Sequence, residues 1–287
     1  MTKTTILMLS CASLFSLRLA FAADIGALVT SSHGIARLET SLEQAKKDHG
    51  LQHESVIRAL NNLGLAWQNQ AEQRKAIDHF EQALAIKKLM YGKSHESLSA
   101  SYNYLGDAWA QLGDAHKALE FHELALAVDK KNYGGQHQYV AIDLNNIGGD
   151  WQNLGDFTKA IGYFEQALAI SSKINGQHNQ NVATSLNNLG YAWDSLGDPR
   201  KALGYHERTL AILKTLYGVQ DANVANTLNN IGYDWFNLGD YHKSIEYCQQ
   251  ALAVLNQTVE PNNPLIEMTQ KNIEMAQARL SRKKARG

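Results

Sequence analysis

Residues 182–218 read VATSLNNLGYAWDSLGDPRKALGYHERTLAILKTLYG, and this pattern returns every 42 residues along the chain. All five tryptophans follow the same interval: Trp67, Trp109, Trp151, Trp193 and Trp235. A period of roughly 20–50 residues is typical of a solenoid, in which each repeat buries its apolar face against its neighbours. The period therefore predicts a stack of like units.

Each unit is expected to contain two helices. In the first half, Val182, Leu186, Leu189 and Trp193 recur at steps of three and four, the spacing of one face of an amphipathic helix. Gly197 ends this helix, and Asp198-Pro199 provides an N-cap and a first-turn proline for the next one. The second helix is expected to bury Ala202, His206, Thr209, Leu213 and Leu216.

These residues resemble a known family. Leu189-Gly190, the aromatic Trp193 and then Ala202, with Phe80 four residues after Ala76 in a sister unit, are similar to the tetratricopeptide repeat. The longer period, the LNNLG opening and the Tyr-Gly ending resemble the repeats of kinesin light chains. The resemblance implies an all-α fold, a right-handed α-solenoid of antiparallel helix pairs (a TPR superhelix), and a non-enzymatic binding scaffold.

The repeat pattern divides the chain into segments. Residues 34–55 align with a second helix that lacks its first, which predicts an N-terminal half-repeat cap. Five units of 42 residues follow over residues 56–258. Residues 263–283 keep the register but lose the glycine and tryptophan, which predicts a C-terminal capping helix, and residues 284–287 form a basic tail.

The first 22 residues predict a secretory signal peptide. Lys3 precedes an apolar stretch, and the segment ends in Ala20-Phe21-Ala22, a small-x-small cleavage site. We therefore expect an exported protein, periplasmic or secreted, cleaved near Ala22; a cytoplasmic location is the alternative, because Arg18 interrupts the apolar stretch. Cleavage would leave Cys248 as the single cysteine, a buried core residue on the packed side of its helix.

Charge is distributed unevenly. Of 27 basic residues, two lie in residues 1–22 and five in residues 279–287, which leaves 20 against 28 acidic residues in between. An acidic body argues against a nucleic-acid partner, because phosphates need lysine and arginine along the groove. Membrane contact is expected only through the basic tail.

Two rows of carboxamides recur on the first helices of the units. They comprise Asn61, Asn103, Asn145, Asn187 and Asn229, and beside them Asn69, Gln111, Asn153 and Asn237, with serine at the fourth place of the second row. Carboxamides both donate and accept hydrogen bonds, so such rows can hold the main chain of an extended peptide. The alternative is that these asparagines bridge adjacent helices.

Selectivity is expected from positions that vary between units, namely Tyr191, Tyr233, Phe236, Asp107 and Asp194. The predicted groove is rich in amides, mildly acidic and aromatic toward the C-terminus. Apart from Arg58 these rows contain almost no cation, which argues against acidic peptides as ligands.

No catalytic residues, metal site or small-molecule cofactor are predicted. The histidines lie tens of residues apart, no phosphate-binding glycine loop occurs, and the tryptophans lie in the packed stripe. The predicted function is a scaffold that binds a protein or peptide partner in its concave groove. Alternatives are a self-associating structural protein with no groove ligand or, without a functional leader, a cytosolic adaptor. The oligomeric state is not defined by the sequence.

Overall fold

The computed structural model describes residues 32–284, which form twelve α-helices and no strand. The predicted all-α class is therefore confirmed. The predicted leader (residues 1–22) and residues 285–287 of the predicted tail lie outside the described residues.

The helices alternate between the two kinds expected from each repeat. They are α3 (Ser32–His49), α4 (Glu54–Asn69), α5 (Gln73–Tyr91), α6 (Ser97–Leu112), α7 (Ala115–Tyr133), α8 (Gln138–Asn153), α9 (Phe157–Asn175), α10 (Gln180–Ser195), α11 (Pro199–Tyr217), α12 (Ala222–Asn237), α13 (Tyr241–Thr258) and α14 (Pro264–Lys284).

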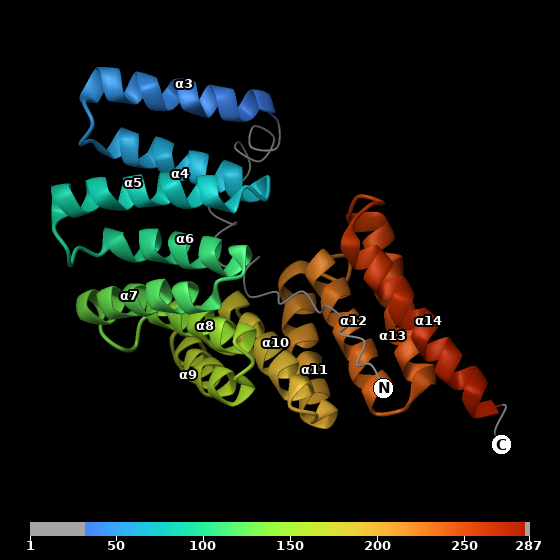
Figure 1. Cartoon of the computed structure of the whole chain (residues 1–287). Coiled ribbons are helices and arrows are strands. Elements are labelled where there is room, and N and C mark those ends of the chain that lie inside the picture. The colour runs from blue at the N-terminus through green and yellow to red at the C-terminus, as the bar shows by residue number, and fades with distance from the viewer. Residues whose placement is uncertain (1–31, 285–287) are drawn as a thin grey trace. The chain divides into compact units, whose positions relative to one another are not determined.

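The chain forms two compact units, one that ends at Asp156 and one that begins at Phe157. In the first unit α3 to α8 pack in chain order, each against the next, with the antiparallel pairing visible in Figure 1. In the second unit α9 to α14 do the same. Within each unit, helices that are neighbours in sequence are thus neighbours in space, as expected for a helical solenoid.

The hinge between the two helices of a repeat has the predicted chemistry. Gly113 ends α6 in a left-handed conformation with φ of 92°, which glycine adopts without strain. The next residue, Asp114, caps α7, because its carboxylate accepts a hydrogen bond of 3.1 Å from the backbone N–H of Lys117. Asp198 and Asp240 cap α11 and α13 in the same way.

Within each unit the core consists of apolar side chains packed between successive helices. Leu63, Leu105 and Leu189 are fully buried, as is Cys248, whose place in the core is confirmed. Burial of Leu216 was a wrong prediction, since it is 39% exposed. It lies in the last turn of α11, a helix of 19 residues whose partner α10 has 16.

The tryptophans lie partly buried at the C-terminal ends of the first helices. A lysine from the first turn of the following helix covers the ring: the Lys117 Nζ lies 3.7 Å from the Trp109 ring centroid, and the Lys201 Nζ 3.6 Å from that of Trp193. These rings therefore join the two helices of one repeat through packing and a cation–π contact.

A glycine in the first helix lets the second helix approach closely. Gly64 faces the ring of Phe80, Gly106 faces His122 and Gly190 faces His206. A Cβ at any of these glycines would lie less than 3.0 Å from the facing ring. The glycine of the Leu-Gly pair is thus a packing requirement in these three repeats.

Candidate binding surface

The first row of asparagines links successive first helices. The side-chain oxygen of Asn187 accepts a hydrogen bond of 3.2 Å from Asn230 Nδ2, and that of Asn229 accepts one of 3.0 Å from Asn272 Nδ2. Asn103 accepts similarly from Asn146 at 3.4 Å. In each case the donor is the second asparagine of the Asn-Asn pair in the following repeat, or its equivalent in α14.

In the first repeat the bond is absent, because the following helix lacks the second asparagine that would donate it. Tyr104 replaces the second asparagine of α6. The side-chain oxygen of Asn61, which would accept the bond, is buried without a hydrogen-bond partner among the described residues. The bridging of helices, one of the two roles expected for this row, is therefore present in the structure.

The two carboxamide rows differ in exposure. In the first row Asn103, Asn145 and Asn229 are buried, and Asn61 and Asn187 are half-buried. The second row is exposed throughout and consists of Asn69, Gln111, Asn153 and Asn237. The carboxamides that a partner can reach thus belong mainly to the second row.

The predicted aromatic end of the groove lies in the second unit. Tyr191 on α10 and Tyr233 and Phe236 on α12 are half-buried, and the Tyr233 and Phe236 rings stack with centroids 6.3 Å apart. Asp194 lies among them, and its Oδ1 accepts a hydrogen bond of 2.7 Å from Asn237 Nδ2. Burial and the Asp194 charge raise the pKa of Tyr191 and of Tyr233. The structure therefore brings four of the five predicted selectivity residues onto two adjacent first helices.

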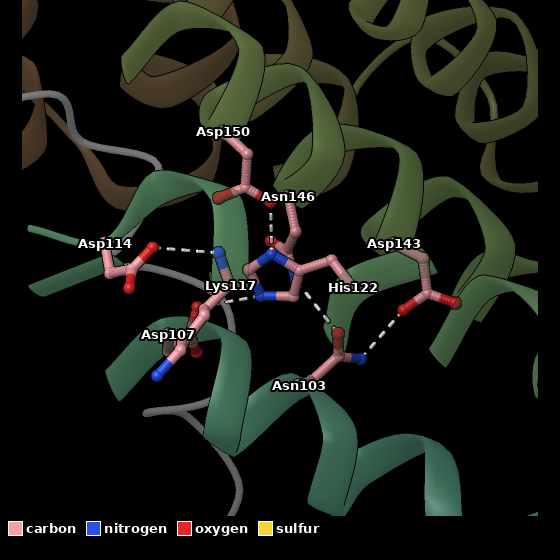
Figure 2. Close-up of polar contacts among 8 residues, drawn as sticks. All are labelled: Asn103, Asp107, Asp114, Lys117, His122, Asp143, Asn146 and Asp150. Carbon is pink, nitrogen blue, oxygen red and sulfur yellow. Dashed lines mark hydrogen bonds and ion pairs between the residues drawn. The ribbon is translucent and has the colours of Figure 1, made fainter. Parts of the chain in front are cut away.

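The fifth selectivity residue, Asp107, faces a buried histidine in the first unit (Figure 2). His122 Nε2 lies 3.6 Å from the Asp107 carboxylate, and His122 Nδ1 donates a hydrogen bond of 2.6 Å to Asp150. Burial lowers the pKa of His122, but the two neighbouring carboxylates outweigh burial and raise the pKa to about 10. The Asp150 hydrogen bond and the two carboxylate charges thus favour the protonated imidazole.

A second cluster of buried polar side chains, contributed by α6, α7 and α8, lies in the same unit as His122. Ser99 donates a hydrogen bond of 2.7 Å to Asp129, and Asn103 donates one of 2.8 Å to Asp143, as Figure 2 shows for the latter. Burial and the neighbouring Asp129 carboxylate raise the pKa of Asp143 to about 8, although the hydrogen bond from Asn103 opposes this rise. The two neighbouring carboxylates thus favour the protonated form of Asp143.

The second unit repeats the histidine–aspartate contact. His206 Nδ1 donates a hydrogen bond of 2.7 Å to Asp234, and both side chains are buried. Sequence analysis did not identify these pairs, although residues 28 positions apart carry the signal. The pairs at this spacing are Leu38 with Ala66, Phe80 with Ala108, His122 with Asp150, Phe164 with Ala192, His206 with Asp234, and Cys248 with Ala276.

The residue pairs 28 positions apart show how the second helix of one repeat packs on the first helix of the next. Where the second helix presents an apolar side chain or the Cys248 thiol, the next first helix presents alanine; where it presents histidine, the next presents aspartate. The rule follows from burial, because a histidine taken out of water needs a hydrogen-bond partner.

These buried groups are not accessible to a substrate. The side chains of His122, Asp150, His206 and Asp234 are 2% exposed or less, and that of Asp107 is 17% exposed. Burial raises the pKa of the Cys248 thiol to about 12, so it is not a thiolate nucleophile. Within residues 32–284 no group of three or more histidine, cysteine, aspartate or glutamate residues is placed to hold a metal ion. None of the helices described is both long and apolar enough to cross a membrane.

Comparison with known proteins identifies the repeat. Two models of the tetratricopeptide repeat match the chain, one at residues 34–88 and 144–215 and the other at residues 98–139 and 224–265. A search of curated proteins found no match.

Several solved structures have the same fold. BtubC (BKLC) from P. vanneervenii is 27% identical, with 78% of this chain and 90% of that chain covered and a TM-score of 0.67. A putative kinesin light chain repeat protein from Podosopora anserina is 21% identical, with 72% and 98% covered and a TM-score of 0.60. The quorum sensor NprR from B. thuringiensis is 16% identical, with 82% and 64% covered and a TM-score of 0.66. From the period of its helix pairs and these matches, the chain belongs to the tetratricopeptide repeat family.

Proposed function

We propose that the protein is an interaction scaffold that binds an extended peptide or protein segment along the first helices of its repeats. The observation that carries the proposal is the exposed second row of carboxamides, which occurs at one position in four of the five repeats, with serine in the other. Main-chain groups of an extended segment also recur at regular spacing, so a row of amides can bind them without reading the sequence.

The neighbouring buried groups support a binding role over catalysis. Stacked helix repeats typically offer extended surfaces to partner proteins. Here the buried histidine–aspartate groups are enclosed between helices, whereas the accessible residues predicted to line the groove are mainly amides and aromatic rings. Amides and aromatic rings suit recognition, and an amide is neither a general base nor a nucleophile.

The two terminal helices favour this function over end-to-end self-association. On α14, Glu274 and Gln277 occupy the places of the glycine and tryptophan of a full repeat, and the side chains of both are exposed. On α3, the exposed residues include Arg37, Glu43 and Lys47. Polar outer faces of this kind are typical of capping elements.

We further propose that the protein acts after export, on the basis of the predicted leader in residues 1–22. N-terminal sequencing of the protein purified from its native cells tests this. A mature chain that starts near Ala23 supports export, and an intact Met1 supports the cytosolic adaptor.

The binding function is tested by a pull-down from the native cell envelope. The bait is the full chain, compared with the triple variant Asn69→Ala, Gln111→Ala and Asn153→Ala. The matched control is Glu81→Ala, Glu123→Ala and Glu165→Ala, three exposed residues at the same spacing on the second helices. Circular dichroism first establishes that all three are equally helical.

A protein that the chain and the control variant retain, and the carboxamide variant loses, supports the groove as the binding site. Equal retention by all three baits contradicts it and directs attention to the second helices or the ends of the array.

A further inference from the structure

The first helices of the last four repeats carry charge of a single sign. Helices α6, α8, α10 and α12 contain no lysine, arginine or histidine, and their charged residues are all aspartates. The five are Asp107, Asp143, Asp150, Asp194 and Asp234. The lysines of these repeats lie on the second helices and loops, where Lys117, Lys201 and Lys243 cover tryptophan rings.

Three of these aspartates face a histidine, and a fourth is enclosed between helices. Asp107 and Asp150 face His122, and Asp143 is fully buried, where it accepts a hydrogen bond from Asn103. Asp234 accepts a hydrogen bond from His206.

Asp194 differs from the other four. It is half-buried, and the hydrogen bond it accepts comes from the neutral amide of Asn237. Burial raises the pKa of Asp194, whereas the Asn237 hydrogen bond and the charge of His206 lower it. Among the described residues Asp194 makes no ion pair. A carboxylate held in partial burial with a neutral donor attracts a cation more strongly than one in open solvent.

Two tyrosine rings lie beside this carboxylate. The Asp194 charge acts on both Tyr191 and Tyr233, and Asn237 contacts Tyr233 as well as Asp194. In the part of the chain that the structure describes, no lysine or arginine covers either ring. They differ in this from Trp193 and Trp235, whose rings are each covered by a lysine of their own repeat.

We propose that Tyr191, Tyr233 and Asp194 form a subsite for a lysine or arginine side chain of the bound segment. The partner segment is therefore basic. The carboxylate neutralises the cation, and the electron-rich faces of the tyrosines bind it through cation–π contacts. This inference rests on the proposed peptide-binding function, and it adds the chemistry of the ligand.

The test uses an array of 15-residue peptides of random sequence, probed with the full chain. We expect the retained peptides to be enriched in lysine and arginine. The tightest arginine peptide is then compared in solution with a version in which citrulline replaces the arginine, which removes the charge and keeps the shape. Affinity is expected to fall about three- to thirty-fold with citrulline and to weaken as salt is raised.

Variants of the chain test which residues cause the preference for arginine. Asp194→Asn removes the charge and retains the oxygen that accepts from Asn237, so it is expected to lose most of the arginine preference. Asp198→Asn is the control, because it removes a nearby charge and keeps an N-cap residue for α11. Tyr191→Leu is expected to weaken arginine binding, whereas Tyr191→Phe keeps the ring and retains it.

Each outcome separates the two proposals. The cation subsite is overturned if the arginine and citrulline peptides bind with equal affinity, or if Asp194→Asn binds the arginine peptide as tightly as the original chain does. Either result leaves the peptide-binding groove unaffected. Enrichment of acidic peptides likewise overturns the subsite. No binding by any peptide contradicts the peptide-binding function and the subsite with it.

Discussion

At the scale of single residues, the glycine that faces the second helix is the most constrained position of the repeat. A Cβ at Gly190 would meet the ring of His206, which is buried and hydrogen-bonded to Asp234 and so has no room to move. We expect Gly190→Ala to destabilise the protein by about 1–3 kcal/mol, as overpacking does. Urea unfolding measures this.

The matched control is Gly204→Ala in the adjacent helix α11. Gly204 is exposed, and a Cβ there would meet nothing within 4 Å. Alanine is favoured over glycine in a helix, so this variant is expected to gain about 0.5–1 kcal/mol. Equal effects of the two substitutions would contradict the close-packing argument.

Two buried groups, Asp143 and His122, predict that the free energy of unfolding depends on pH. The pKa of Asp143 is raised from 3.8 to about 8, and that of His122 from 6.5 to about 10. Both raised values mean that the folded chain holds its protons to higher pH than the unfolded chain. The stabilisation is complete below the ordinary values and is lost between pH 4 and 8 for Asp143 and between pH 6.5 and 10 for His122.

The substitution Asp143→Asn isolates one of these groups. Asparagine stays neutral at every pH and its oxygen can still accept from Asn103. We expect the wild-type chain to lose on the order of 1–3 kcal/mol more than the variant between pH 5 and pH 8. Denaturant midpoints at the two pH values measure this, and parallel losses would rule out a raised Asp143 pKa.

At the scale of helices, the residue pairs 28 positions apart predict which second helix stacks on which first helix. His206→Phe alone leaves the Asp234 carboxylate buried without its donor, and Asp234→Ala alone leaves the histidine unpaired. Each is expected to cost about 3–5 kcal/mol.

The double variant recreates the combination found at Phe80 and Ala108, which lie together in one apolar cluster. We therefore expect the two substitutions to compensate each other by roughly 2–3 kcal/mol in a double-mutant cycle of urea unfolding. Additive losses would contradict the pairing rule.

At the scale of the whole molecule, stability depends on covering the ends of the stack. Helix α14 packs Ile266 against Ala225, Val254 and Leu255, and its Asn272 donates to Asn229. A chain that ends at residue 263 exposes this cluster to water.

We expect this truncation to destabilise the second unit by about 3 kcal/mol or more and to cause association. Thermal unfolding and light scattering measure both effects. The control is Gln277→Ala, an exposed position on the same helix, which is expected to change neither. A truncated chain that stays monomeric and unfolds at the same temperature would show that α14 is dispensable.

Much of this architecture could be predicted because each repeat places equivalent residues in equivalent surroundings. The signals are local: tryptophans at intervals of 42 residues, apolar residues such as Leu186 and Leu189 at steps of three and four, and Gly-Asp hinges. Where they occur, the structure has a helix pair and a capped hinge. The burial of Leu216 was predicted wrongly, because the periodicity of one helix does not show where the helix packed against it ends.

By itself the sequence determined the helix pairs, their order and the face of each helix that is apolar, since these depend on residues a few positions apart. Only the tertiary structure decided which carboxamides are exposed and which aspartates have partners. Asn103 and Asn187 are equivalent in the repeat, yet one is buried against Asp143 and the other is half-buried. The physical reason is that these contacts join non-equivalent residues of successive repeats, 28 to 43 positions apart, and only packing brings such residues together.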